Sequence, residues 1–137
     1  MREIKFRAWD KVNERMYQDD TFRIGYNGIV YYLKSIGVGN TKYKFSENIV
    51  LLQYTGLKDK NGVDVYEGDI VRYSYTDIDD QLYSNRIAQI AFYNGCFQTF
   101  ETDDFDEEEA IPLYIVDAYE VIGNLYQNFE LLTNIKK

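Results

Sequence analysis

A chain of 137 residues with no histidine and one cysteine has few routes to catalysis or metal binding. It carries 15 Lys and Arg against 23 Asp and Glu, for a net charge of −8, and 17% of its residues are aromatic. The missing imidazole excludes Ser–His and Cys–His nucleophiles and histidine-ligated zinc, and one thiol excludes an intrachain disulfide. We therefore expect no catalytic residues, no metal, no cofactor and a protein that is not an enzyme.

The length fits one domain, or two small lobes that share a core. Cys96 is a lone thiol, which suits a reducing compartment. Residues 1–5 lack the apolar run of a secretory signal, and no stretch approaches the ~20 apolar residues that a membrane span needs. We expect a cytoplasmic protein that does not contact membrane.

The first predicted element is a hairpin. In residues 2–9, Ile4, Phe6 and Ala8 alternate with polar residues, which is typical of a half-buried strand. Residues 10–14 form a polar turn and the chain returns through Arg15–Tyr17. Trp9 is expected in the core or at an interface.

Two further hairpins are predicted at Asn-Gly pairs, because both central residues of a type I′ turn need a positive φ. Asn27-Gly28 divides two apolar and aromatic runs within residues 22–33. Asn94-Gly95 lies between residues 86–93 and Cys96–Phe100. Residues 37–40 are expected to form a loop.

The remaining pattern predicts strands at residues 49–54, 69–75 and 119–125. Helix is expected only briefly, at residues 107–110 and in one turn that Asn128 caps through Leu132. The change near residues 57–62 to regular hairpins indicates a lobe boundary. We expect lobes of residues 1–60 and 61–137 within a single compact unit.

The sequence Tyr66-Glu67-Gly68-Asp69-Ile70-Val71 predicts a turn that starts a strand. Gly68 is able to adopt a positive φ, and Asp69 is able to accept hydrogen bonds from nearby backbone N–H groups. A structural turn is therefore favoured here over a ligand site.

Lys58 and Lys60 flank another turn, which ends at Asn61-Gly62. The spacing of Asp59 and Asn61 resembles a calcium loop, but Val63 and Asp64 occupy the positions that need a ligand and a glycine. A phosphate site at these two lysines is not favoured either, because the segment lacks the Gly-x-x-x-x-Gly-Lys pattern of phosphate-binding loops. A solvated turn is favoured.

Seven of the nine residues 101–109 are acidic. A solvated loop is the favoured interpretation. A divalent-cation site remains an alternative because hard cations bind carboxylate oxygens. Another is mimicry of nucleic acid that inhibits a host DNA-binding protein, since an extended chain rises ~3.3 Å per residue and a DNA strand carries one phosphate per ~3.4 Å.

Four segments resemble, in the same order, the YopX-type proteins of phages and prophages. They are Phe6-Arg7-Ala8-Trp9-Asp10 with Met16, residues 52–62 (Leu-Gln-Tyr-Thr-Gly-Leu-Lys-Asp-Lys-Asn-Gly), residues 66–71, and residues 120–128 (Glu-Val-Ile-Gly-Asn-Leu-Tyr-Gln-Asn) with Leu131-Leu132. The resemblance implies a phage or prophage protein in a bacterial cytoplasm. It also implies an α+β, mostly β fold in which an N-terminal mixed β/α portion precedes an SH3-like β-barrel. It carries over no catalytic residues.

The charge is divided unevenly along the chain. Residues 1–60 hold 11 Lys and Arg against 7 Asp and Glu, and residues 61–137 hold 4 against 16. Either the two halves neutralise each other in a monomer, or the basic face of one copy meets the acidic face of the next, head to tail. The leading hypothesis is a self-assembling or protein-binding module whose protein partners are unknown.

The alternative is nucleic-acid binding through the barrel and through Arg2, Lys5, Arg7 and Trp9. The net charge of −8 argues against it, because phosphate neutralisation dominates such affinity. The candidate interaction surface comprises Arg7, Trp9, Tyr54, Lys58 and Lys60, together with the acidic residues Asp103, Asp104, Asp106, Glu107, Glu108 and Glu109.

Overall fold

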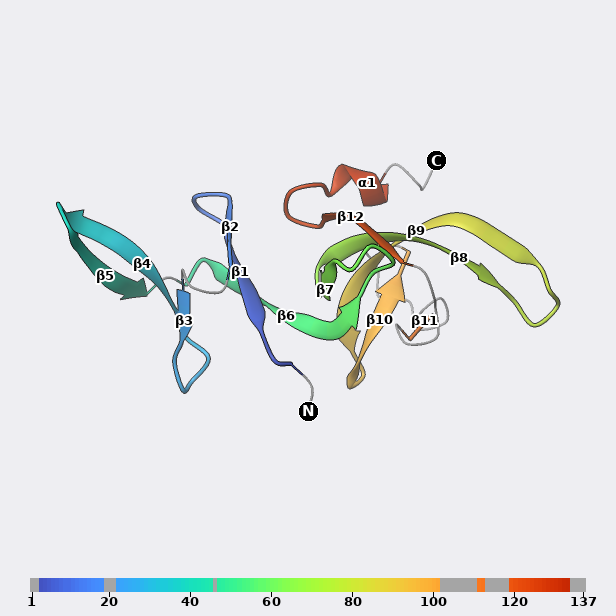
Figure 1. Ribbon diagram of the computed structural model, residues 1–137, viewed down its shortest axis with the longest axis horizontal. Helices are drawn as coiled ribbons and strands as arrows, with labels where there is room; N and C mark the ends of the chain where they lie inside the picture. The colour runs from blue at the N-terminus through green and yellow to red at the C-terminus, as the bar shows by residue number, and fades with distance from the viewer. Residues whose placement is uncertain (1–2, 19–21, 46, 102–110, 113–118, 134–137) are drawn as a thin grey trace. The chain divides into compact units, whose positions relative to one another are not determined.

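The computed structural model describes residues 3–18, 22–45, 47–101, 111–112 and 119–133. These residues form antiparallel strands and one short helix (Figure 1), so the predicted mostly-β character is confirmed. The chain divides into two compact units, essentially residues 3–53 and 54–137. The lobe boundary predicted at residues 60 and 61 stays a prediction.

The first unit contains two small sheets. Their strands are β1 (Phe6–Asp10), β2 (Arg15–Tyr17), β3 (Phe22–Ile24), β4 (Val30–Gly37), β5 (Asn40–Phe45) and the start of β6 (Ile49–Lys58). One sheet has the order β2-β1-β6 and the other has the order β3-β4-β5. A cluster of buried Ala8, Phe22 and Val30 joins β1 to β3 and β4.

The predicted N-terminal hairpin is confirmed, and Asp10 holds its turn. The carboxylate Oδ1 of Asp10 accepts hydrogen bonds from the backbone N–H groups of Val12, at 2.9 Å, and Asn13, at 3.0 Å. Its Oδ2 accepts from the Tyr17 hydroxyl at 3.1 Å. Burial alone would raise the pKa of Asp10, but these hydrogen bonds outweigh it and the pKa lies below its usual value.

The Asn27-Gly28 hairpin is present between β3 and β4, with a three-residue loop in place of the two-residue type I′ turn. The backbone N–H of Gly25 donates to the Ile29 carbonyl at 2.7 Å, and only Gly28 of the Asn-Gly pair has a positive φ, 82°. Since one left-handed residue closes a three-residue hairpin loop, the glycine suffices.

The predicted loop at residues 37–40 is shorter than expected. Val38 and Gly39 alone form the turn, and β4 and β5 pair directly on either side of it. Every element described in the first unit is a strand, so the helical component implied for the N-terminal portion is not found in that part of the chain. Residues 40–45 alternate Thr, Tyr and Phe with Asn and Lys, a period of two that belongs to strands.

The second unit is a curled antiparallel sheet whose order is β11-β10-β9-β8-β12. Its elements are β7 (Asp64–Tyr66), β8 (Asp69–Thr76), β9 (Leu82–Tyr93), β10 (Cys96–Phe100), β11 (Ile111–Pro112), β12 (Glu120–Asn124) and the helix α1 (Glu130–Thr133). β8 and β9 bend strongly along their length (Figure 1). Their buried residues Val71, Tyr73, Ala88 and Ile90 form the core with Val65 and Tyr119.

Two turns of the second unit match their predictions. Asn94 and Gly95 have φ values of 49° and 81°, and Tyr93 pairs with Cys96 across them, as a type I′ turn requires. Gly68 has a φ of 84°, and the buried Asp69 carboxylate accepts a hydrogen bond from the Tyr66 N–H at 2.8 Å. The structural interpretation of the Gly68-Asp69 turn is therefore confirmed.

The predicted helical turn near the C-terminus is also present, but Asn128 acts differently from a cap. Its carbonyl accepts from the Leu131 N–H at 3.0 Å, whereas its side-chain Oδ1 accepts from the Asn124 N–H at 3.2 Å. Asn128 therefore ties the end of β12 to α1. The helix predicted at residues 107–110 lies outside the described residues.

Candidate interaction surfaces

Three of the predicted surface residues are buried. Arg7 and Trp9 lie in β1 with exposed fractions of 9% and 6%. Tyr54, in β6, packs its ring on Tyr66 of β7 with the ring centroids 5.6 Å apart. All three therefore contribute to packing, and their predicted role in binding stays a prediction.

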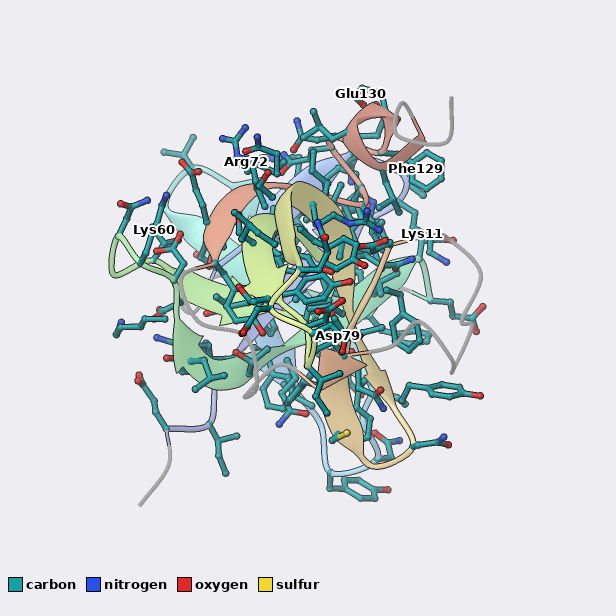
Figure 2. All side chains as sticks on the ribbon, turned by 90° about the vertical axis from the view of Figure 1, so that its right-hand side faces the viewer. Lys11, Lys60, Arg72, Asp79, Phe129 and Glu130 are labelled. Carbon is teal, nitrogen blue, oxygen red and sulfur yellow. The ribbon has the colours of Figure 1, made fainter. Side chains whose placement is uncertain are left out.

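Lys58 and Lys60 are exposed on the turn between β6 and β7, as predicted for a solvated turn. The Lys58 ammonium lies 2.6 Å from the Asp64 carboxylate. Lys60 and Arg72 both approach Oε2 of Glu120, at 3.7 Å and 3.1 Å. Figure 2 places the labelled Lys60 and Arg72 side chains on the same side of the second unit.

The buried carboxylate of Asp59 stabilises the turn between β6 and β7. Its Oδ1 accepts from the backbone N–H groups of Asn61 and Val63, at 2.8 Å and 2.9 Å. Its Oδ2 accepts from Val121 of β12 at 3.0 Å. Burial alone would raise the pKa of Asp59, but the three N–H donors lower it below the usual value. Asp59 therefore orders the turn and leaves its oxygens committed to the backbone.

Most of the predicted acidic surface lies outside the described residues. This applies to Asp103, Asp104, Asp106 and residues 107–109. Glu101, the first residue of that run, is described. It accepts a 2.6 Å hydrogen bond at Oε1 from Nε of Arg86 and a second one at Oε2 from the same guanidinium. This one carboxylate of the run is thus part of a structural ion pair.

Tyrosines stack along β8 and β9 next to this ion pair. The rings of Tyr75 and Tyr83 are nearly parallel, with centroids 4.9 Å apart, and Tyr73 stacks on Tyr75 at 6.1 Å. The Arg86 guanidinium lies 5.9 Å from the Tyr83 ring centroid. Burial, followed by the Glu101 charge, raises the pKa of Tyr73. The ladder was not predicted from the sequence, although the alternation Tyr73-Ser74-Tyr75 places two tyrosines on one face of a strand.

The hairpin between β8 and β9 ends in exposed apolar side chains. Ile78 is 98% exposed and Leu82 is 60% exposed. Asp79 and Asp80 follow Ile78 in the turn, and Figure 2 labels Asp79 there.

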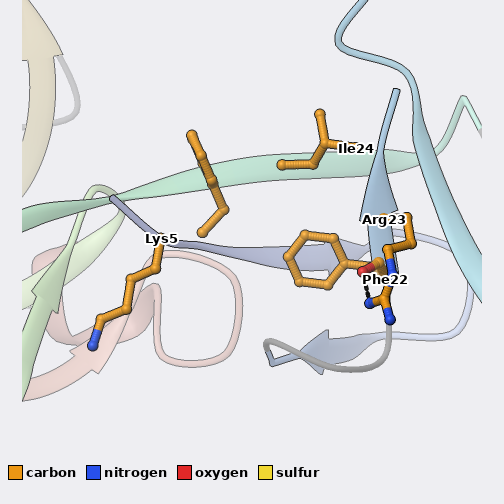
Figure 3. A pocket seen from close by; sticks show the side chains of 5 residues that line it. Lys5, Phe22, Arg23 and Ile24 are labelled. Atoms are coloured by element: carbon orange, nitrogen blue, oxygen red, sulfur yellow. Dashed lines mark hydrogen bonds between the residues drawn. The ribbon is translucent and has the colours of Figure 1, made fainter. Parts of the chain in front are cut away.

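The first unit contains a pocket of about 260 Å³ at β3. Phe6, Phe22 and Ile24 supply its apolar wall, and Lys5 and Arg23 lie on opposite sides of it (Figure 3). The Arg23 guanidinium donates to the carbonyl of Phe22 at 3.0 Å. Small-molecule sites are usually larger, ~300–1,000 Å³, so the pocket is better matched to one side chain.

Within the ranges that the structure describes, no three His, Cys, Asp or Glu side chains lie together as metal ligands. No helix in those ranges has the length and apolar character needed to cross a membrane.

Comparison with known proteins identifies the family. Two solved structures resemble the chain over 96% of its length. Protein EF1440 from Enterococcus faecalis is 28% identical, with a TM-score of 0.59 and 99% of its chain covered. Protein yopX from Bacillus subtilis is 25% identical, with a TM-score of 0.60 and 98% covered. No curated protein matches the chain. The model of the YopX protein family matches residues 5–133, and the chain therefore belongs to the YopX family.

Proposed function

We propose that this protein is a non-enzymatic accessory protein of phages or prophages that assembles with copies of itself in the bacterial cytoplasm. In this proposal the curled sheet of the second unit is an SH3-like barrel that serves as a rigid scaffold. The function resides in exposed surfaces rather than in a reactive side chain.

The observation that carries the proposal is the division of charge between the two units. Residues 1–53 hold 9 Lys and Arg against 6 Asp and Glu, whereas residues 54–137 hold 6 against 17. The division thus persists when the chain is cut where the structure separates its units. Opposite charges on two surfaces of one molecule favour head-to-tail contacts between copies.

Exposed apolar side chains supply the second requirement, because charge alone gives a weak and salt-sensitive contact. Tyr26 and Val38 protrude from the first unit, and Ile78 and Phe92 from the second. Scattered apolar residues are normal on a surface. What supports an interaction here is their position. Tyr26, Val38 and Ile78 lie on exposed hairpin turns, and Phe92 lies on the exposed part of β9.

The test is sedimentation velocity of the full chain at low and high salt. At about 0.05 M salt we expect oligomers that form with rising protein concentration. At about 1 M salt the Debye length falls to about 3 Å, so the oligomers are expected to weaken. A monomer at every concentration and at both salt levels contradicts the proposal.

The same sedimentation experiment also tests for binding of nucleic acid, with fluorescence as a second detection channel. A fluorescent single-stranded oligonucleotide is added at low salt and its sedimentation is followed separately. We expect it to sediment alone, because the net charge of −8 repels phosphates. Co-sedimentation with a monomeric protein would instead favour nucleic-acid binding.

A further inference from the structure

Two tyrosines face each other across the strands β8 and β9. Tyr75 of β8 is the register partner of Tyr83 of β9. Directly opposed residues of an antiparallel pair project from the same face of the sheet, with their Cβ atoms about 5 Å apart. The two rings stack nearly parallel, with an interplanar angle of 12° and centroids 4.9 Å apart. The fold therefore holds two phenol rings in contact.

A bulge in β9 produces this pairing. The register shifts between Tyr73 and Tyr75, and without the shift Ser84 would lie opposite Tyr75. One extra residue on β9 accommodates the shift, and Asn85 there has a φ of 54°, a left-handed backbone that occurs in bulges. Because a slip of one residue turns each side chain to the opposite face, the bulge brings the ring of Tyr83 onto the face of Tyr75.

Other tyrosine pairs in the described ranges are less suited to react with a partner ring. Several of their members are buried, namely Tyr54, Tyr66, Tyr73 and Tyr119. Tyr17 and Tyr32 are partly exposed and stack on each other, but their ring centroids are 6.3 Å apart. Tyr75 and Tyr83 combine the shorter separation with partial exposure of both rings. A small oxidant in solution is thus able to reach this pair.

A carboxylate lies close to the Tyr83 hydroxyl. The charge of Asp77, followed by burial, raises the pKa of Tyr83 above its usual value. Oδ1 of Asp77 accepts from the backbone N–H groups of Asp79 and Gln81, both at 2.9 Å, which fixes the carboxylate in place. A phenol that loses an electron becomes strongly acidic, and a neighbouring carboxylate is able to accept its proton. Asp77 therefore favours oxidation of Tyr83 to a neutral phenoxyl radical.

We propose that Tyr75 and Tyr83 form a dityrosine crosslink when the protein meets a one-electron oxidant. Each phenol gives one electron to the oxidant and releases its hydroxyl proton, to Asp77 or to water, which leaves a phenoxyl radical. The two radicals join through a carbon–carbon bond between ring carbons ortho to the hydroxyls. The hydrogens on those two carbons then move through water to the two oxygens. Two equivalents of oxidant are reduced, and the crosslinked chain has lost two hydrogen atoms.

The fold makes this coupling intramolecular. Holding two reacting groups in contact replaces a bimolecular encounter with a unimolecular step, so the bond forms within one chain rather than between copies. The bond closes the β8–β9 hairpin covalently, which lowers the conformational entropy of the unfolded chain. The inference goes beyond the proposed self-assembly and does not depend on it.

The first test oxidises the full chain at several dilutions with tris(bipyridine)ruthenium(II), persulfate and brief illumination, which together generate a one-electron oxidant. We expect dityrosine fluorescence in a product that migrates as a monomer on a denaturing gel, with a yield per chain that does not depend on dilution. A protease that cleaves before aspartates separates the two rings, because Asp77, Asp79 and Asp80 lie between them. Mass spectrometry should therefore find the two peptides joined and lighter by two hydrogen atoms.

The second test removes one hydroxyl at a time. Tyr75→Phe and Tyr83→Phe keep the stacked rings, but the new ring is unable to form a phenoxyl radical. Each variant should lose most of the monomeric crosslink. Tyr32→Phe is the matched control, because it removes one hydroxyl from another partly exposed stacked pair. It should leave the yield unchanged.

Two results would overturn the proposal. One is crosslinked material that consists of dimers, or whose yield per chain falls on dilution, because the coupling would then occur between copies. The other is a monomeric crosslink that persists in Tyr83→Phe and disappears in Tyr32→Phe. The peptide map of the wild-type chain identifies the joined residues even if a variant fails to fold.

Discussion

The carboxylate of Asp59 accepts a hydrogen bond at 3.0 Å from the backbone N–H of Val121, 62 residues further along the chain. The same carboxylate holds Asn61 and Val63 of its own turn. One buried side chain thus connects the turn after β6 to the strand β12. The Lys60 N–H adds a 2.9 Å hydrogen bond to the Tyr119 carbonyl beside it.

Replacement of this carboxylate is expected to be strongly destabilising. Asp59→Asn turns one acceptor oxygen into a donor that faces a backbone N–H, which leaves buried polar groups unpaired. The free energy of unfolding should fall by about 1–3 kcal/mol, as measured by urea denaturation. Asp64→Asn, on the same turn, weakens the pair with Lys58 and should change the free energy of unfolding by less than about 1 kcal/mol. Equal losses in the two variants would show that Asp59 has no special role.

The same residue predicts part of the dependence of stability on pH. The pKa of Asp59 is lower in the folded than in the unfolded chain, where it is about 3.9. The contribution of Asp59 to the free energy of unfolding is therefore complete above about pH 4. It is lost as the pH falls through the pKa that Asp59 has in the folded chain. Urea denaturation between about pH 6 and pH 2 should show a shallower acid loss for Asp59→Asn than for the wild type. Parallel curves would refute the assignment.

Two turns of the same design differ at their left-handed residue. Gly62 has a φ of 82° in the turn after Asp59, and Asp80 has a φ of 60° at the corresponding place after Asp77. Gly62→Ala should lower the free energy of unfolding by about 1–2 kcal/mol, because a Cβ is unfavourable there although the space is open. Asp80→Gly should be neutral or slightly stabilising by thermal denaturation. A neutral Gly62→Ala would mean that this turn has a different backbone.

Gly123 and Asn128 are expected to show strong energetic coupling. A Cβ on Gly123 would lie 2.6 Å from Oδ1 of Asn128 and 2.8 Å from its Cβ. Gly123→Ala should therefore destabilise the protein by about 1–3 kcal/mol through overpacking. Asn128→Ala loses the hydrogen bond to Asn124 and removes Oδ1 and Cγ, but it keeps the Cβ, so it relieves part of the overlap. In a double-mutant cycle the combined loss should be smaller than the sum; strict additivity would show that the two residues do not touch.

The Arg86–Glu101 pair predicts an optical signal. Glu101→Gln keeps an acceptor for the Tyr73 hydroxyl, which donates to Oε1 at 3.1 Å, but removes the negative charge. Burial of Tyr73 remains, so its pKa should fall toward the usual value without reaching it. Ultraviolet absorbance during alkaline titration would report the change, with Tyr73→Phe identifying its share.

The stability of the same variant is a separate readout. Since both side chains are partly exposed, the loss of the ion pair should cost only about 1 kcal/mol. Arg86→Lys is the control, because a lysine is unable to make two parallel hydrogen bonds to one carboxylate. It should lose as much stability as Glu101→Gln while leaving the pKa of Tyr73 high. If Glu101→Gln leaves the titration of Tyr73 unchanged, the Glu101 charge does not act on that phenol.

Several parts of the fold were determined by the sequence alone, because their physical cause is local. Asn94-Gly95 and Gly68-Asp69 specify their turns through the left-handed backbone that glycine and asparagine tolerate. Period-two alternation predicted β1, and the runs of apolar and aromatic residues predicted β8, β10, β12 and part of β9 in the second unit. The four motifs likewise identified the YopX family without coordinates.

Other features were decided only by the tertiary structure. The sequence indicates a solvated turn at Lys58 and Lys60, but only the fold brings Val121 to Asp59 beneath it. Arg7 resembles a surface cation in the sequence pattern, yet in the folded chain it is only 9% exposed. Among the described residues, β8 and β9 also pair with each other through Tyr75↔Tyr83 and Thr76↔Leu82, a register that no local pattern encodes. Local preferences act over a few residues, whereas burial and long-range pairing depend on which distant segments the folded chain brings together.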